Sequence, residues 1–92
     1  MFSNTENSSK GTKMDILVTL PNNYDKGKEL AKEFLNGKVI VVNFIRLSAE
    51  DKQRVFDYLN GVAYVTNADI KQVTTDTIVY LPAAFSAMKL RL

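Results

Sequence analysis

The side chains that could carry chemistry in this chain are lysines, arginines, carboxylates and hydroxyls, because its 92 residues include neither histidine nor cysteine. Without histidine the commonest general base near neutral pH is missing, and no hydroxyl can be paired with one. Without cysteine there is neither a thiolate metal site nor a disulfide. The glycines at 11, 27, 37 and 61 lack the spacing of a phosphate-binding loop. A lysine nucleophile stays open but none is singled out, so we expect no enzyme, no metal and no cofactor.

The charges are balanced and spread along the chain. Twelve basic residues against ten acidic ones leave a net charge of +2, and no run of Lys or Arg forms a footprint for nucleic acid. The composition, 46% hydrophobic and 24% charged, is typical of a folded globular protein. A chain of this length forms one domain with a thin core. The lack of cysteine suits a reducing cytoplasm.

Residues 14–82 show the patterns of one mixed domain. Apolar runs predict strands over 14–20, 38–44, 62–66, 70–73 and 77–81, and helices over 24–35 and 49–60. Asn23 and Ser48 have the side chains of helix N-caps, while Gly37 and Gly61 are placed to end the two helices. The expected fold is an α/β (α+β) two-layer sandwich of about five strands and two helices, in the order β-α-β-α-β-β-β. Its first two strands should be parallel, joined by a right-handed crossover.

The strand over 38–44 indicates that the sheet needs cover from outside the chain. Residues 39–42 are all aliphatic and do not alternate, as is typical of a strand covered on both faces. Two helices can cover only one face of such a sheet. The second helix also carries an apolar arc through Phe56 that is wider than a thin core needs. We therefore expect a symmetric dimer through the open sheet face, with Val41 and Phe56 in self-association.

The two ends of the chain lie outside these patterns. Residues 1–13 are polar and contain neither the apolar run of a signal peptide nor the stripe of an interfacial helix. A disordered leader, or an engineering scar, is expected there. Residues 83–92 mix apolar and basic side chains, and we expect a tail or a short helix. No window approaches the roughly 18 apolar residues that a transmembrane helix needs.

An ordered set of residues between 41 and 82 goes beyond what the fold requires. It comprises Val41, Val42, Asn43, Arg46, Leu47, Gln53, Arg54, Asp57, Tyr58, Leu59, Gly61, Tyr64, Asp69, Ile70 and Pro82. Each match is weak by itself, but a strand that ends in VVN, followed by an arginine and then by QR-x-x-D-[aromatic]-L-x-G-x-x-Y, is fairly specific as a set. This pattern resembles the globular domain of the SepF family of bacterial cell-division proteins, over residues 14–82.

The resemblance implies a non-enzymatic adaptor that binds the C-terminal tail of the tubulin-like protein FtsZ. Members of the family dimerise through this domain and assemble into curved polymers, so a homodimer and a higher polymer are implied here, in the cytoplasm at the division site. The glycine that matches Gly61 lies where subunits self-associate in the family.

The family also tethers division filaments to membrane, normally through an amphipathic helix at the extreme N-terminus. Residues 1–13 do not show that helix. Membrane contact is therefore expected only if an N-terminal amphipathic helix is missing from this chain; otherwise the chain is a short relative unable to hold membrane alone.

The FtsZ-tail pocket of the family draws on the dimer interface near the last strands, where a basic and an aromatic residue recur. Counting back from Pro82 puts Gln72 at the basic position, with Lys71 adjacent, and Ile78 at the aromatic one. Neither match is faithful. The resemblance thus implies a tail site near Lys71, Gln72, Ile78 and Tyr80, with the contacts left open.

Two other interpretations compete with the adaptor. A small-molecule-sensing domain of the ACT or ferredoxin-like type shares this element order and also dimerises, but it usually has a glycine in its first loop, where this chain has Pro21, Asn22 and Asn23. An RNA-binding domain would need exposed aromatics interleaved with basic residues on its strands, and residues 38–44 offer almost none.

Overall fold

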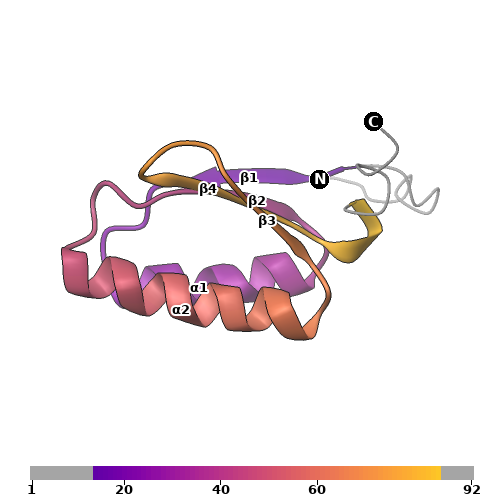
Figure 1. The fold of residues 1–92 in the computed structure, drawn as a ribbon, viewed down its shortest axis with the longest axis horizontal. Coiled ribbons are helices and arrows are strands. Elements are labelled where there is room, and N and C mark those ends of the chain that lie inside the picture. Colours follow the sequence, from indigo (N-terminus) through magenta and orange to yellow (C-terminus); the bar gives the residue numbers. More distant parts are fainter. Residues whose placement is uncertain (1–13, 86–92) are drawn as a thin grey trace.

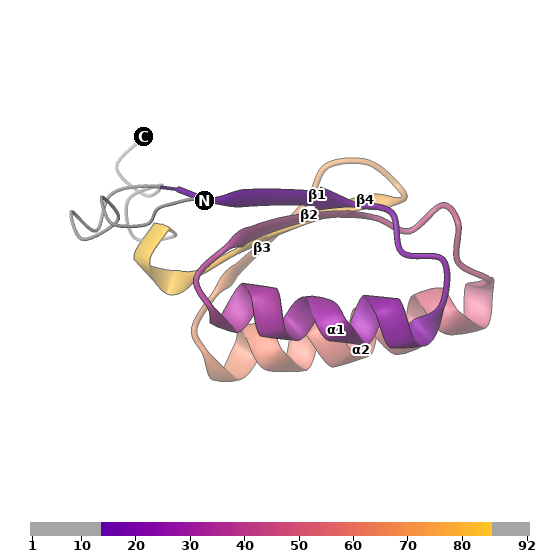
Figure 2. The same cartoon turned by 180° about the vertical axis from the view of Figure 1, so that it is seen from behind.

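The computed structural model describes residues 14–85, which form two layers (Figures 1 and 2). The elements are β1 (Ile16–Thr19), α1 (Tyr24–Leu35), β2 (Val39–Asn43), α2 (Ala49–Val65), β3 (Asp69–Gln72) and β4 (Thr77–Leu81). Both helices lie on the same face of the sheet. Figure 1 views the domain from the side of α2 and β3, and Figure 2 from the side of α1 and β1. The predicted two-layer α+β sandwich is confirmed.

The sheet has the strand order β1-β2-β4-β3. β1 and β2 are parallel neighbours joined through α1, as the sequence predicted, while β4 is antiparallel to both β2 and β3. β1 and β3 therefore form the two edges of the sheet. The helical segment that begins at residue 83 follows β4, and residues 1–13 and 86–92 lie outside the described part, as do the interpretations made of them.

The predicted helix starts are correct because the capping side chains form their bonds. The Asn23 carboxamide oxygen accepts a hydrogen bond from the Lys26 backbone N–H at 2.8 Å, and the Ser48 hydroxyl accepts one from the Asp51 N–H at 3.1 Å. α1 ends before Gly37, which has a φ of 97°, a left-handed conformation that glycine adopts without steric cost. The bounds of α1 match the prediction.

The prediction for residues 61–66 is wrong. Gly61 does not end the second helix, and residues 62–66 are not a strand: α2 continues to Val65. The helix continues because Ala63 is fully buried and Val62 packs against the core. Gly61 faces open space: apart from its chain neighbours and the nearby backbone of its own helix, no atom lies within 4 Å of the position that a Cβ would occupy. The cost of an internal glycine, up to about 1 kcal/mol, is smaller than the gain from burying this turn.

The sheet accordingly has four strands instead of five within the described residues. The turn after α2 is formed at Thr66, whose hydroxyl donates to the Val62 carbonyl at 2.8 Å, and at Asn67, whose φ is 60°. Asparagine tolerates this left-handed conformation better than most residues. The segment at 67–69 therefore links a helix to a strand, and only the connection from β3 to β4 is a hairpin.

The core lies between the helices and one face of the sheet. Ile40, Val42, Ile78 and Tyr80 project from the two central strands toward Leu30 and Phe34 of α1 and Val55 and Leu59 of α2, all of them buried. The rings of Phe34 and Tyr80 meet edge to face with centroids 6.4 Å apart. The Tyr80 hydroxyl donates to the Asn60 side-chain oxygen at 2.9 Å, so its polar end is satisfied within the core.

Replacing Tyr80 with phenylalanine should remove part of the alkaline sensitivity of the fold. Burial raises the pKa of the Tyr80 phenol well above its usual value. In the unfolded chain the phenol ionises near pH ~10, whereas the folded state keeps its proton. Its contribution to stability is therefore complete below that pH and falls by about 1.4 kcal/mol per pH unit as the pH rises further.

The measurement is the free energy of unfolding of wild type and Tyr80→Phe from about pH 8 to about pH 11.5. At the lower end of this range the variant should be about 1 kcal/mol less stable through the lost bond to Asn60. Above about pH 10 this difference should shrink and then change sign before about pH 11.5, because the other titrating groups are common to both proteins. A difference that stayed constant with pH would contradict the assignment.

Candidate functional site

The sheet face opposite the helices is largely uncovered by the described chain. We call this surface the open face. Side chains alternate along each strand, so every second residue of the four strands points to it. It is formed by Ile16, Val18, Val39, Val41, Asn43, Asp69, Lys71, Thr77, Val79 and Leu81. Val39 is buried at 3% exposure, but on the edge strand Ile16 and Val18 remain 57% and 65% exposed. Apolar side chains so exposed beside two further aliphatic strands are unusual for a surface that meets only water.

Val41 lies at the centre of the open face, and it is half-buried. The strand register places it between Val18 of β1 and Val79 of β4, in a row that ends at Lys71 of β3. Lys71 and Asp69 form an ion pair at 3.9 Å on that edge strand. The open face is thus mostly aliphatic over β1, β2 and β4, with the polar pair Asn43 and Thr77 at one end and a charged border on β3.

Two of the four predicted tail-site residues meet on the other side of the sheet. Gln72 and Ile78 are cross-strand partners, and both line a hollow between α2 and the β3–β4 hairpin. The hollow has a volume of about 150 Å³ and is lined by Lys52, Gln53, Phe56, Gln72, Thr75 and Ile78. The hollow lies between the first half of α2 and the last two strands, on the helix side of the sheet, and therefore away from the open face that was expected to form the dimer interface.

The other two predicted residues are not in the hollow. Tyr80 is only 2% exposed and its hydroxyl is bonded to Asn60, so it belongs to the core beside the hollow. Lys71 points to the open face, because its neighbour Gln72 points to the helices. Lys71 and Gln72 are adjacent in the chain, but their side chains point to opposite faces of the sheet. The sequence alone could not show this separation.

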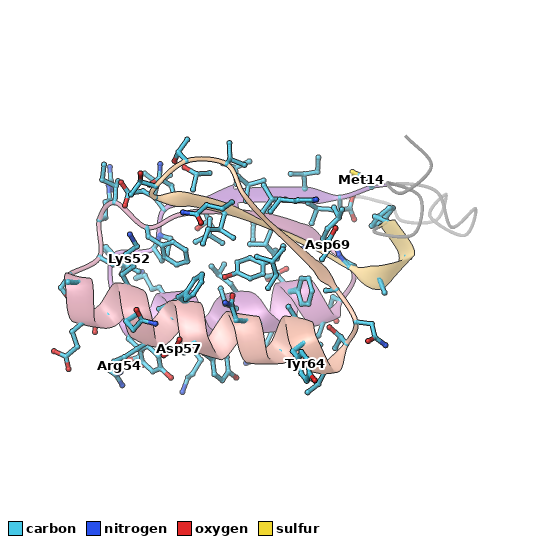
Figure 3. All side chains as sticks on the ribbon, in the orientation of Figure 1. Met14, Lys52, Arg54, Asp57, Tyr64 and Asp69 are labelled. Carbon is cyan, nitrogen blue, oxygen red and sulfur yellow. The ribbon has the colours of Figure 1, made fainter. Side chains whose placement is uncertain are left out.

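Sequence analysis missed Lys52 and Gln53 as members of this site. Lys52 Nζ lies 3.2 Å from Asp76 Oδ1, and this ion pair fastens α2 to the hairpin (Figure 3 labels Lys52). The backbone carbonyl of Asp76 in turn accepts a hydrogen bond from the Phe44 N–H at 2.8 Å. Lys52 and Phe56 are four residues apart and therefore share one face of the helix. This spacing in the sequence could have indicated that both line the same site. Phe56, expected in self-association, contributes to the hollow.

The face of α2 that points away from the sheet carries a second surface. Tyr58, Tyr64 and Val65 are 40%, 83% and 75% exposed, and Gly61 lies among them (Figure 3 shows Tyr64 and Arg54 on this outward side). Tyr58 also lines an open groove of about 540 Å³ between the helices, together with Asp25, Lys28, Glu29, Ala31, Lys32 and Leu35. The Arg54 guanidinium lies 3.9 Å from the centre of the Tyr24 ring and 3.5 Å from the Asp51 carboxylate, and so fastens α2 to α1.

Neither a metal site nor a membrane span is found within residues 14–85. Among these residues no group of three or more acidic or other metal-binding side chains is placed to hold a metal ion. No helix in the same part of the chain is both long and apolar enough to cross a membrane.

Comparison with known proteins identifies the family. Residues 16–86 match the family model described as "Cell division protein SepF". The chain belongs to the SepF family. Among curated relatives it is similar to the SepF protein of Lactobacillus gasseri, with 32% identity over 79 residues that cover 86% of this chain and 55% of the relative. It is also similar to that of Lacticaseibacillus casei, with 33% identity over 75 residues that cover 82% and 50%.

Solved SepF-like structures have the same fold. The chain superposes on a SepF-like protein from Archaeoglobus fulgidus with a TM-score of 0.68 and 20% identity, covering 75% of this chain and 86% of the other. For a SepF-like protein from Pyrococcus furiosus the TM-score is 0.66 at 15% identity, with 77% and 89% covered. The predicted family resemblance is confirmed, and it replaces the sensing-domain and RNA-binding interpretations.

The SepF chain described here spans about half the length of the curated relatives it matches. It is a protein of a cell-division family, matched over residues 16–86. The roles of whole relatives, which are about twice as long, come to this chain only as proposals.

Proposed function

We propose that this SepF chain is a non-enzymatic adaptor of bacterial cell division, which binds the C-terminal tail of FtsZ at the division site in the cytoplasm. The observation that carries the proposal is the hollow between α2 and the β3–β4 hairpin, because it contains both Gln72 and Ile78, the positions that the family resemblance implied. Their basic and aromatic character is absent at these positions, but Lys52 and Phe56 supply a cation and an aromatic ring in the same hollow.

The size of the hollow supports a peptide ligand. Sites for small molecules usually enclose about 300–1,000 Å³, whereas this one encloses about 150 Å³. A space of that size accommodates one apolar group of benzene size. The groove between α1 and α2 is larger, but four of its seven lining residues are charged, which is unlike the mostly apolar lining of a metabolite pocket. A peptide that inserts one side chain into the hollow fits these dimensions best.

Dimerisation through the open face is the second part of the proposal. Its aliphatic side chains on β1, β2 and β4 form one surface, and a two-fold contact would place the same surface of a second copy against it. The outward face of α2, with Gly61 among exposed Tyr58, Tyr64 and Val65, lies on the opposite layer and would be free for further polymerisation. Each copy then has two separate self-association surfaces, as a polymer requires.

A titration with a synthetic peptide copying the FtsZ C-terminal tail tests the adaptor function. We expect saturable binding with a Kd of about 1–100 µM, or about 5.5–8 kcal/mol, because one inserted side chain and a few hydrogen bonds make a modest interface. Isothermal titration calorimetry or fluorescence anisotropy measures it, with a scrambled peptide of the same composition as the control. No saturable binding up to about 1 mM peptide, by protein shown to be folded, would refute the function.

A further inference from the structure

β3 offers an unpaired backbone edge directly beside the hollow. In the described sheet this strand pairs only with β4, and the Val73 N–H donates to the Thr77 carbonyl at 2.8 Å, which makes Val73 and Thr77 a hydrogen-bonded pair of the antiparallel ladder. Such pairs alternate along the ladder, so Lys71 and Asp69 also bond to β4. The N–H and C=O groups of Gln72 and Ile70 consequently point away from the sheet.

The edge is reachable from solvent near the hollow. Lys71, Gln72 and the hairpin residues directly after them are exposed, whereas Ile70 is half-buried and its N–H is already bonded to the Asp69 carboxylate at 3.1 Å. The open backbone groups are therefore those of Gln72. Paired residues in neighbouring strands point to the same face, so a residue pairing with Gln72 would direct its side chain to the helix side, which is the side of the hollow.

The charge at the rim of the hollow also favours one kind of peptide. Of the six residues that line it, Lys52 alone is charged, and its ammonium is held by the Asp76 carboxylate at 3.2 Å in a pair whose side chains are 35% and 36% exposed. A pair so exposed contributes at most about 1 kcal/mol. A bound peptide would also be held by backbone hydrogen bonds to β3, so a carboxylate of that peptide can replace Asp76 as the partner of Lys52.

We propose that the free edge of β3 binds an extended acidic and apolar peptide as an added strand, with one apolar side chain in the hollow and a carboxylate that displaces Asp76 from Lys52. This inference names the contacts of the peptide site and rests on the function proposed above. Strand addition provides affinity through main-chain bonds, and the hollow selects the side chain. Asp76 then acts as an internal competitor that disfavours peptides without a carboxylate.

Strand addition is tested with unchanged protein and modified peptides. Single N-methyl groups are placed at each position of the FtsZ-tail peptide in turn, and the Kd of each is measured. The free Gln72 carbonyl can accept one peptide N–H, so N-methylation should weaken binding at least about tenfold at the position that donates to it and much less at most other positions. Equal tolerance at all positions would overturn strand addition while leaving the adaptor function intact. Absence of binding by the unmodified peptide would refute the function itself.

The exchange at Lys52 is tested by three charge changes that leave the fold in place. Lys52→Gln should weaken binding of the tail about tenfold, whereas Asp76→Asn should tighten it several-fold, because the amide no longer competes for Lys52. Lys71→Gln is the matched control: it removes the same charge near the same sheet edge but on the open face, and should change the Kd less than about twofold.

The decisive result is that Lys52→Gln raises the Kd of the tail peptide whereas Asp76→Asn lowers it. If both variants bind like wild type, or if Asp76→Asn also weakens binding, the exchange is overturned. Circular dichroism and the melting temperature of each variant show whether the fold is kept. The Asp76→Asn change leaves the backbone carbonyl that accepts the Phe44 N–H in place, so the hairpin should stay attached.

Discussion

Replacing Val41 with lysine should convert the proposed open-face dimer into a folded monomer. Val41 lies at the centre of the open face, so a face-to-face dimer would remove its side chain from water in both copies. Burying an ammonium without a partner costs several kcal/mol per ion, and each 1.4 kcal/mol is a factor of ten in the dissociation constant. We expect self-association at least about a hundredfold weaker, measured by light scattering or analytical ultracentrifugation across micromolar concentrations.

The controls separate loss of the interface from loss of the fold. Val18→Lys places the same charge on the edge strand, where the side chain is 65% exposed and the monomer should tolerate it. Val65→Lys introduces it on the outward face of α2, where Val65 is 75% exposed, and should leave a sheet-mediated dimer intact. A wild-type protein that stays monomeric, or a Val65→Lys variant that dissociates while Val41→Lys does not, would contradict the open-face dimer.

Gly27→Ala should destabilise the domain although alanine is the better helix former. A Cβ at Gly27 would lie 2.5 Å from one γ-methyl of Val55 and 2.8 Å from the other, at the point where α1 packs on α2. Val55 is fully buried and its branched side chain has one strongly preferred rotamer in a helix, so the helices must move apart. We expect the free energy of unfolding to fall by about 1–2 kcal/mol after the helix-propensity gain is included.

Gly61→Ala is the matched control, because it makes the same change inside α2 at a position with open space around it. It should raise the free energy of unfolding by about 0.5–1 kcal/mol. Urea denaturation at one fixed protein concentration measures both, since the proposed dimerisation would make stability concentration-dependent. On a Val55→Ala background, Gly27→Ala should cost less than in wild type. Two variants with the same effect would show that the Gly27 contact is unimportant.

Elements with local signals at both ends could be predicted closely. The helix at 24–35 was bounded correctly because Asn23 caps its start and Gly37 provides the left-handed residue after its end. The strand at 77–81 was also bounded correctly, since a polar turn precedes it and Pro82 follows. At Gly61 the same local signal was misleading, because glycine inside a helix costs less than the burial that Ala63 and Val62 obtain from continuing it.

The candidate site shows a similar division. Gln72 and Ile78 were predicted by counting back from Pro82 under the family resemblance, and the structure places both at one hollow. Lys52 and Asp76 are 24 residues apart, and nothing in their immediate neighbours shows that they form an ion pair. Which face of β3 Lys71 occupies also depends on its register with β4, which local sequence does not reveal.

The sequence by itself determined that this is a small mixed domain of the SepF family, with a parallel β-α-β start and a strand too apolar for a sheet covered on one side. Periodicity and capping act over a few neighbouring residues, and the ordered motif between residues 41 and 82 is visible along the chain without knowledge of its contacts. Only the tertiary structure decided the strand count, the length of α2 and the separation of the predicted tail residues onto opposite faces of the sheet. Those outcomes depend on long-range packing and strand register, in which the burial of a distant partner outweighs the local preference of the chain.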